Sequence, residues 1–264
     1  TFNNEIWRII GIIPTEDTSG NIENRFKIIK DTSIGNHYWN QCTKVEVDTG
    51  VKCDGSDKYP NDWTNATLNT YLNNDYYNTL STDAKNMIGT TKYYLGGGGF
   101  DTYQNITSNT IWQYERKKTN GSDCAISKWG MLAGTECYFF KTNPIMQNDA
   151  SKNIAIMYAS DYGYGASKDC TNTLYNYKDS FLCITTNNWL DKSQNTWLLT
   201  TASSTEVTVF ALRSSGNIDY YGERIQNDVT EWSYEIHPVL SLSSNVKISG
   251  GEGTSGSPYT LSVK

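Results

Sequence analysis

The cysteines of this 264-residue chain constrain its fold more than any other feature. The six fall into three local pairs, with separations of 11, 13 and 13 residues: Cys42 and Cys53, Cys124 and Cys137, Cys170 and Cys183. None belongs to a CxxC motif and no histidine lies near any of them, which argues against structural zinc. An even number of cysteines in a chain rich in Ser, Thr and Asn is typical of disulfides formed outside the cytosol.

Pairing between sequence neighbours is the simplest of the many possible connectivities. Each bond then closes one surface loop of about a dozen residues, and such a loop contributes roughly 3 kcal/mol in the chain-entropy description. The alternative is six buried free thiols. The spacing and the compartment therefore predict three local disulfides: Cys42–Cys53, Cys124–Cys137 and Cys170–Cys183.

Composition favours strands joined by turns. The chain is 37% hydrophobic and 19% charged, with 19 Tyr and 8 Trp but only 4 Met. Aromatic residues suit sheets, whereas a helical bundle needs Ala, Leu, Glu and Lys. The net charge of -6 supplies no basic face, so we expect no nucleic-acid partner. No apolar run is long enough to span a bilayer and no signal peptide is present, so we read the chain as a mature fragment or as a trimmed form. No linker separates two folding units, so we expect one domain, residues 1–264.

Apolar and β-branched runs predict the strands: 5–13, 26–29, 154–158, 197–200, 207–212, 217–221 and 237–242. The first two are expected to form a hairpin, and 217–221 is expected to pair back across a turn at 214–216. The run 237–242 is expected to be a last buried strand, and 250–258 is expected to be a loop. The residues SDYGYG, 160–165, are expected to form a turn.

Two short helices are expected in the first third of the chain. Thr64 is a plausible N-cap, and Leu68, Tyr71 and Leu72 share one helical face. Asn73 and its neighbour interrupt this stretch, which then continues to residue 80. Ser81 can cap a second helix that carries apolar residues at positions 84, 87 and 88.

Motifs for catalysis are absent from the sequence. Only two histidines occur, His37 and His237, and there is no GxSxG or HExxH motif, so we expect no enzyme, no metal and no cofactor. His237 precedes a proline at the start of an apolar strand, which favours a structural role. Asp54 and Asp57 match no EF-hand and are read as a solvated turn. A distant carboxylate pair for glycoside hydrolysis stays open.

Four segments in order resemble a family of surface proteins from gut Firmicutes and their relatives, which share a domain of unknown function. These are FNNEIWRIIGI, DWTNATLNTYLNNDYYNTLS, SDYGYG and the tail from NTWLLTTASS to GSPYTL. The resemblance covers nearly the whole chain. Each motif is modest alone, and their occurrence in the same order makes the set more specific.

The tail also resembles the C-terminal half of C-type-lectin-like folds. That group includes formylglycine-generating enzymes and the variable proteins of diversity-generating retroelements, in which a WxL-type strand, a hairpin and an R-P-V/A strand build the ligand-bearing sheet. The matching positions here are Trp197, Leu199, Gly216, Ile218 and 238–240. His237 departs from the pattern, because the family usually has arginine there.

The resemblance implies an α+β, C-type-lectin-like fold with mixed or antiparallel sheets, two or three short helices and long disulfide-closed loops. It implies that the strand 5–13 pairs near the strand 237–242, because such folds join their termini. It also implies an extracellular place on the bacterial cell surface, with a membrane or pilin-like N-terminal tether missing from this fragment. The calcium-lectin signatures Glu-Pro-Asn and Trp-Asn-Asp are absent, and no cysteine follows Cys183 to serve formylglycine-type chemistry.

We expect a ligand-binding or adhesion module, and in a narrower form the variable protein of a diversity-generating retroelement. Its last third mixes rigid aromatic with small polar residues, as paratopes do. The predicted ligand-binding residues are Trp197, Ser203, Ser204, Glu206, Tyr220, Tyr221, Glu223, Arg224, Trp232 and Tyr234. The expected partner is a protein or glycan on another cell or surface. The alternatives are a pilin-like structural subunit and, less favoured, a hydrolase.

Overall fold

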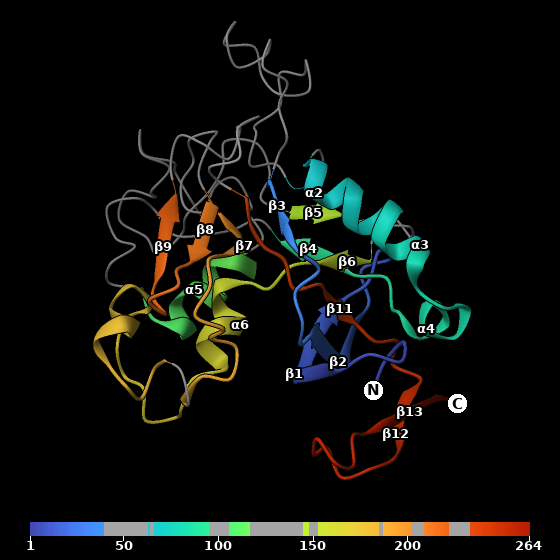
Figure 1. Cartoon of the computed structure of the whole chain (residues 1–264). Coiled ribbons are helices and arrows are strands. Elements are labelled where there is room, and N and C mark those ends of the chain that lie inside the picture. The colour runs from blue at the N-terminus through green and yellow to red at the C-terminus, as the bar shows by residue number, and fades with distance from the viewer. Residues whose placement is uncertain are drawn as a thin grey trace, which may run out of the picture.

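Two larger β-sheets, two small strand pairs and several short helices make up the part of the chain that the computed structural model describes (Figure 1). That part comprises residues 1–39, 63, 66–94, 106–116, 145–147, 153–184, 187–201, 209–221 and 233–264. The predicted α+β class with mixed or antiparallel sheets is confirmed, but the described residues form more than the two or three short helices predicted.

The first sheet has four antiparallel strands in the order β1-β2-β11-β6. Their bounds are β1 (Trp7–Glu16), β2 (Ile22–Lys30), β11 (Val239–Ser241) and β6 (Ile154–Ala155). The predicted β1–β2 hairpin is confirmed, and Asp17 organises its turn by accepting the main-chain N–H groups of Ser19 and Asn21, each at 2.8 Å. The segments near the two chain ends thus share one sheet, with β2 lying between them.

The second sheet has five strands in the order β3-β10-β7-β8-β9. Their bounds are β3 (Asn36–His37), β10 (Tyr234–Glu235), β7 (Thr196–Thr201), β8 (Val209–Leu212) and β9 (Ile218–Tyr221). Only the β10–β7 pair among these strands is parallel. The predicted turn before β9 is confirmed, and it needs glycine at Gly216, where φ is +85° and a Cβ atom would lie 2.4 Å from Ile184.

Two small antiparallel pairs complete the strands: β4 (Lys92–Tyr94) with β5 (Ile145–Gln147), and β12 (Val246–Gly250) with β13 (Thr260–Val263). The predicted buried strand at 237–242 is confirmed as β11, whereas the exposed strands β12 and β13 that follow it were not predicted. Sequence patterning missed them because only Val246 of β12 is buried. The predicted loop at 250–258 is confirmed as the connection of this hairpin.

The predicted helix after Thr64 begins at residue 67. It runs through α2 (Thr67–Thr70), the π-helical η2 (Tyr71–Tyr76) and α3 (Tyr77–Thr79). Asn73 lies in η2, where its amide donates to Ile154 O at 2.7 Å and accepts from Ile154 N at 2.8 Å, so it pairs with the outer strand β6. The next helix is α4 (Thr82–Met87), and Ser81 caps it as predicted, accepting from Ala84 N at 3.2 Å.

The remaining helices are α5 (Ser108–Arg116), α6 (Ala159–Tyr164) and the 3₁₀-helical η4 (Leu174–Asp179). The expectation of a turn at SDYGYG is wrong, because these residues form α6. Asp161 supplies the reason: its carboxylate accepts the main-chain N–H of Tyr158 at 2.8 Å and so caps the helix start. Among the described helices, none is long and apolar enough to cross a membrane.

Candidate functional site

Two of the predicted ligand-binding residues belong to the core. Trp197 and Tyr234 are 0% and 5% exposed, and their rings lie 4.3 Å apart. The Trp197 indole donates to His37 O at 3.0 Å, and Arg213 donates to the Tyr234 hydroxyl at 2.8 Å. The prediction that these two side chains form a binding surface is therefore wrong. Aromatic composition does not distinguish a residue on the inner face of a strand from one on the outer face.

The other predicted residues flank the five-stranded sheet in sequence. Tyr220 and Tyr221 lie in β9, where they pair with Phe210 and Val209 of β8; only their backbone is described. The rest lie outside the described residues: Ser203, Ser204, Glu206, Glu223, Arg224 and Trp232. The same is true of the predicted disulfides formed by Cys42, Cys53, Cys124 and Cys137.

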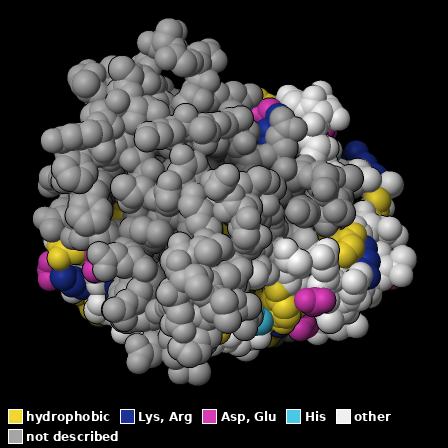
Figure 2. Space-filling model, turned by 90° about the horizontal axis from the view of Figure 1, so that it is seen from above, with side chains coloured by type: hydrophobic (Ala, Val, Ile, Leu, Met, Phe, Trp, Pro, Cys, Tyr) yellow, Lys and Arg dark blue, Asp and Glu magenta, His cyan; other side chains and the backbone are white. Residues whose placement is uncertain are grey.

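The strand register places the ends of β7, β8 and β9 in one row. Thr201 pairs with Val209, and Val209 pairs with Tyr221. The segments 202–208 and 222–232 therefore both join the sheet at this row, which lies near the top of Figure 1. Figure 2 views the molecule from this end, and the described side chains at its rim mix acidic, basic and hydrophobic groups.

The strands behind this row form a buried platform. Leu198, Leu199 and Val209 are 0% exposed and Phe210 is 3% exposed, so both faces of the sheet are covered here. Positions held by such packing keep their geometry when the connecting loops change. We call Thr201, Val209 and Tyr221 the platform row, and we treat it as the described part of the candidate binding site.

A buried carboxylate ties the platform to α6. Glu115 of α5 is 0% exposed, and it accepts the Thr200 hydroxyl at 2.6 Å and the Ser160 main-chain N–H at 3.1 Å. The Ser160 hydroxyl also donates to Glu115, and Ala159 N donates to the Thr200 hydroxyl at 2.8 Å. Glu115 thus accepts three hydrogen bonds from protein groups and is fully buried. It therefore holds β7 and α6 in position and is not accessible to a substrate.

A buried charge pair lies between β2 and α6. Lys27 Nζ is 2.6 Å from Asp161 Oδ2, with side-chain exposures of 5% and 4%, and the ammonium lies 4.6 Å from the centre of the Tyr158 ring. The adjoining cavity of about 30 Å³ is of the size that holds water and no larger ligand. The pair therefore joins the sheet to the helix.

The two histidines hold structural positions: His37 lies in β3, and His237 lies in the connection between β10 and β11. His237 Nδ1 lies 3.0 Å from Lys30 O and its Nε2 lies 3.6 Å from Glu235, while His37 stacks on Tyr71 at 4.1 Å. Burial lowers the pKa of both imidazoles, with the neighbouring hydrogen bonds acting in the opposite direction. Within the described part of the chain, no group of three or more His, Cys, Asp or Glu side chains could hold a metal ion.

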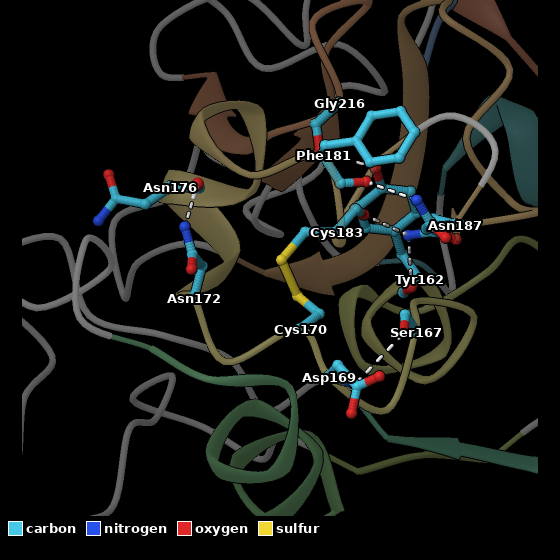
Figure 3. Close-up of a disulfide and its surroundings, with 11 residues drawn as sticks. Tyr162, Ser167, Asp169, Cys170, Asn172, Asn176, Phe181, Cys183, Asn187 and Gly216 are labelled. Carbon is cyan, nitrogen blue, oxygen red and sulfur yellow. Dashed lines mark hydrogen bonds between the residues drawn. A yellow bond between two sulfur atoms is a disulfide. The ribbon is translucent and has the colours of Figure 1, made fainter.

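The predicted disulfide Cys170–Cys183 is confirmed, with a sequence separation of 13 and a Cα–Cα distance of 5.0 Å (Figure 3). Its surroundings are tied to the core by Asn188, whose amide donates to Cys183 O at 3.2 Å and to Tyr162 O at 3.1 Å. Phe181, beside Cys183, is 68% exposed. The loop therefore presents an exposed ring from a fixed frame.

A groove of about 760 Å³ opens at the other end of the molecule, between the start of β1 and the β12–β13 hairpin. Its apolar lining includes Phe2, Ile6, Trp7, Trp189, Pro258 and Tyr259. Sequence reasoning missed this groove because it is built from the two ends of the chain, which no local pattern brings together.

The groove carries a charged cluster on its lining. Asp31 accepts from Arg8 Nε at 2.6 Å and from Lys192 Nζ at 2.8 Å. Burial raises the pKa of Asp31, but the hydrogen bonds from the two cations outweigh it, and the pKa lies below its ordinary value. Asp31 is therefore ionised at neutral pH, and the cluster keeps one excess positive charge.

In comparisons with protein-family models, curated proteins and solved structures, no match to this chain was found.

Proposed function

We propose that this chain is an extracellular binding module of a bacterial surface protein, which holds a protein or glycan ligand next to the platform row. The observation that carries the proposal is the register of Thr201, Val209 and Tyr221. Two segments start from this end of the buried platform: 202–208, which is rich in small polar residues, and 222–232, which is mostly polar and charged and contains Trp232. Binding residues commonly occupy connections of this kind, because loops can vary there without disturbing the core.

The buried polar groups support binding over catalysis. Glu115 and Asp161 are sealed and hydrogen-bonded, and the imidazoles of His37 and His237 each lie against structural partners. A reactive centre needs a nucleophile or a metal within reach of a base. The proposal extends to an N-terminal tether, on the resemblance of the four segments to a family of surface proteins. It extends also to a C-type-lectin-like fold, and in its narrower form to a retroelement-diversified protein, on the resemblance of the tail to C-type-lectin-like folds.

The test is a binding screen followed by substitution at the platform row. The purified chain is applied to a printed glycan array and to immobilised extracellular-matrix proteins, and the best binder is measured by biolayer interferometry. Tyr220→Ala, Tyr221→Ala and Trp232→Ala should each weaken binding, by about 2 kcal/mol or roughly thirtyfold for an anchor residue. The melting temperature should stay nearly unchanged.

Tyr164→Ala is the matched control, because this tyrosine is 66% exposed at the end of α6 and its ring lies beside Gly11 of β1. It should leave binding intact. Unfolding of the Tyr220 and Tyr221 variants would place their rings in the core and contradict the proposal. Self-assembly into filaments with no binder in the screen would favour the pilin-like structural subunit.

A further inference from the structure

The groove at the chain ends has one wall of sheet and one wall of hairpin loop. The sheet wall comes from β1 and the residues before it, including Ile6, Trp7 and Arg8, and the loop wall comes from residues 253–255 and 258–259. The main-chain nitrogen of Thr1 donates to Tyr259 O at 2.6 Å and joins the two walls. Its volume of about 760 Å³ is within the usual range for a ligand pocket.

The loop wall is held in one conformation. Gly253 N and Glu252 N both donate to Ser257 O, at 2.9 and 2.8 Å, and Ser257 N donates to the Thr254 hydroxyl at 3.0 Å. Gly253 has φ +77°, and a Cβ atom there would lie 2.6 Å from the Tyr259 ring. A wall that is already ordered loses little conformational entropy when a ligand binds.

Apolar surface is left exposed to solvent along the groove. Ile6 is 58% exposed, although it lines the groove beside the rings of Trp7 and Phe2. Trp189 forms part of the lining, and the Arg8 guanidinium lies 5.8 Å from the centre of its ring. A ligand with one large apolar group would remove this surface from water.

Arg8 has hydrogen-bond donors that are available to a ligand in the groove. It uses Nε for Asp31, and within the described residues neither of its Nη atoms donates a hydrogen bond. Its side chain is 47% exposed and lines the groove, and Lys192 shares the same Asp31 oxygen. A guanidinium with two NH₂ groups that make no such bond, in a cluster of Arg8, Lys192 and Asp31 that carries one net positive charge, is complementary to a carboxylate.

β1 adds a third element of recognition. It is the outer strand of the order β1-β2-β11-β6, and within the described residues no strand pairs with its other edge. One row of its main-chain N–H and C=O groups is therefore available to an extended peptide. Trp7, Arg8 and Ile9, the first residues of this strand, all line the groove.

We infer that this groove binds the C-terminal residue of an extended peptide whose last side chain is large and apolar. The side chain packs against Ile6 and Trp189, the terminal carboxylate accepts from Arg8, and the preceding residues pair with the open edge of β1. The site is separate from the platform row, so it stands or falls independently of the proposed function.

The test uses N-acetyltryptophan, which reproduces a C-terminal tryptophan, and N-acetyltryptophanamide, which reproduces an internal one. Both are titrated into the ¹⁵N-labelled chain, with the indole signals of Trp7 and Trp189 and the Arg8 Nε–H signal as reporters. The acid should bind in the millimolar range and about tenfold more tightly than the amide. Acetyl-Thr-Val-Trp should bind roughly tenfold more tightly again, because of the added main-chain hydrogen bonds.

Substitutions separate the parts of the site. Arg8→Gln should abolish the preference for the acid, and Ile6→Asn should weaken both compounds without unfolding the chain, because that side chain is exposed. Lys178→Gln is the matched control: it removes a cation that lies 4.7 Å from the Tyr175 ring, outside the groove. It should change nothing, and Tyr220→Ala should also leave this binding unchanged.

Three results would overturn the inference. The first is the absence of signal changes at the groove at about 10 mM acid, a concentration that detects the weakest specific fragments. The second is equal binding of the acid and the amide, which would show that no terminal carboxylate is recognised. The third is binding that Arg8→Gln and Ile6→Asn leave unaltered.

Discussion

The two sheets of this protein are stabilised by different chemistry. The four-stranded sheet carries buried or nearly buried charges that are each paired, as in Lys27 with Asp161 and Lys92 with Glu16. The five-stranded sheet instead packs aromatic rings. The ring centre of Trp197 lies 6.4 Å from that of Trp39 and 4.3 Å from that of Tyr234. Buried ion pairs determine which elements contact each other and add modest net stability, whereas packed aromatic rings stabilise the fold by burying a large apolar area.

This difference bears on where the chain can vary. A buried ion pair links elements that must keep their positions, because a displaced partner leaves a charge alone in the interior. The aromatic packing under the platform is satisfied within the sheet itself, through contacts such as that between Trp197 and His37 O. The segments that start at the platform row can therefore change without disturbing a charge pair.

The largest effect is expected for the aromatic sheet. Trp197→Ala removes a side chain that is 0% exposed, and it should lower the free energy of unfolding by about 3–5 kcal/mol. Urea unfolding followed by circular dichroism measures this loss. Trp112→Ala, at a tryptophan that is 40% exposed, should have a clearly smaller effect. Equal losses of unfolding free energy for the two variants would contradict the conclusion that buried rings stabilise the five-stranded sheet.

The next effect concerns the charge-paired sheet. Asp161→Asn leaves the Lys27 ammonium buried without its carboxylate and weakens the cap of α6, so we expect a loss of about 3 kcal/mol. Asp169→Asn, on the exposed surface, serves as the control and should be nearly neutral. A stable Asp161→Asn protein at neutral pH would mean that the pair is replaceable by neutral hydrogen bonds.

The disulfide tests the platform side of the molecule. Replacing Cys170 and Cys183 by serine opens a loop of 13 residues, which should lower the free energy of unfolding by roughly 2–3 kcal/mol. The contacts of Cys183 with the core should keep the fold cooperative under mild conditions. A reduced chain with an unchanged unfolding midpoint would show that packing alone holds this loop.

The smallest effect is a pH dependence from the histidines. Because burial lowers the pKa of His237 below 6.5, the folded protein favours the neutral imidazole, and the unfolded chain takes up the proton first. Stability should therefore be full above that value and decline as the pH falls through the folded-state pKa. His237→Gln should flatten this decline between about pH 7.5 and pH 5.5.

His37 acts with the same sign, because burial also lowers its pKa. The double variant with His37→Gln should remove the remaining slope in the same range of pH. A slope that survives in the double variant would assign the dependence to carboxylates, which titrate at lower pH.

Local signals in the sequence predicted many elements correctly. The hairpin of β1 and β2, the strands β7, β8 and β9, the Ser81 cap and the Cys170–Cys183 bond all depend on residues close in sequence. Alternation, turn residues and capping residues act over a few positions, so they can be read from sequence. The sequence analysis missed helix α6. Asp161 caps this helix, and most of its residues are buried in a core that local sequence patterns do not reveal.

For the candidate sites, sequence indicated the segments that start at the platform row but misassigned Trp197 and Tyr234. Both are aromatic residues in strands, and which face they occupy depends on what covers the sheet. The groove at the chain ends gave no signal at all, since its lining joins Ile6 and Trp7 to Tyr259 across almost the whole chain.

The sequence by itself determined the local hairpins, the Ser81 helix cap and one local disulfide, because short-range backbone preferences and loop closure decide these. The tertiary structure alone decided the contacts between distant residues: Asn73 with Ile154 across 81 positions, and Lys27 with Asp161 across 134. Buried polar groups need partners, but their sequence does not say which element will supply them. Only the packing of both sheets against the helices brings those partners within hydrogen-bonding distance.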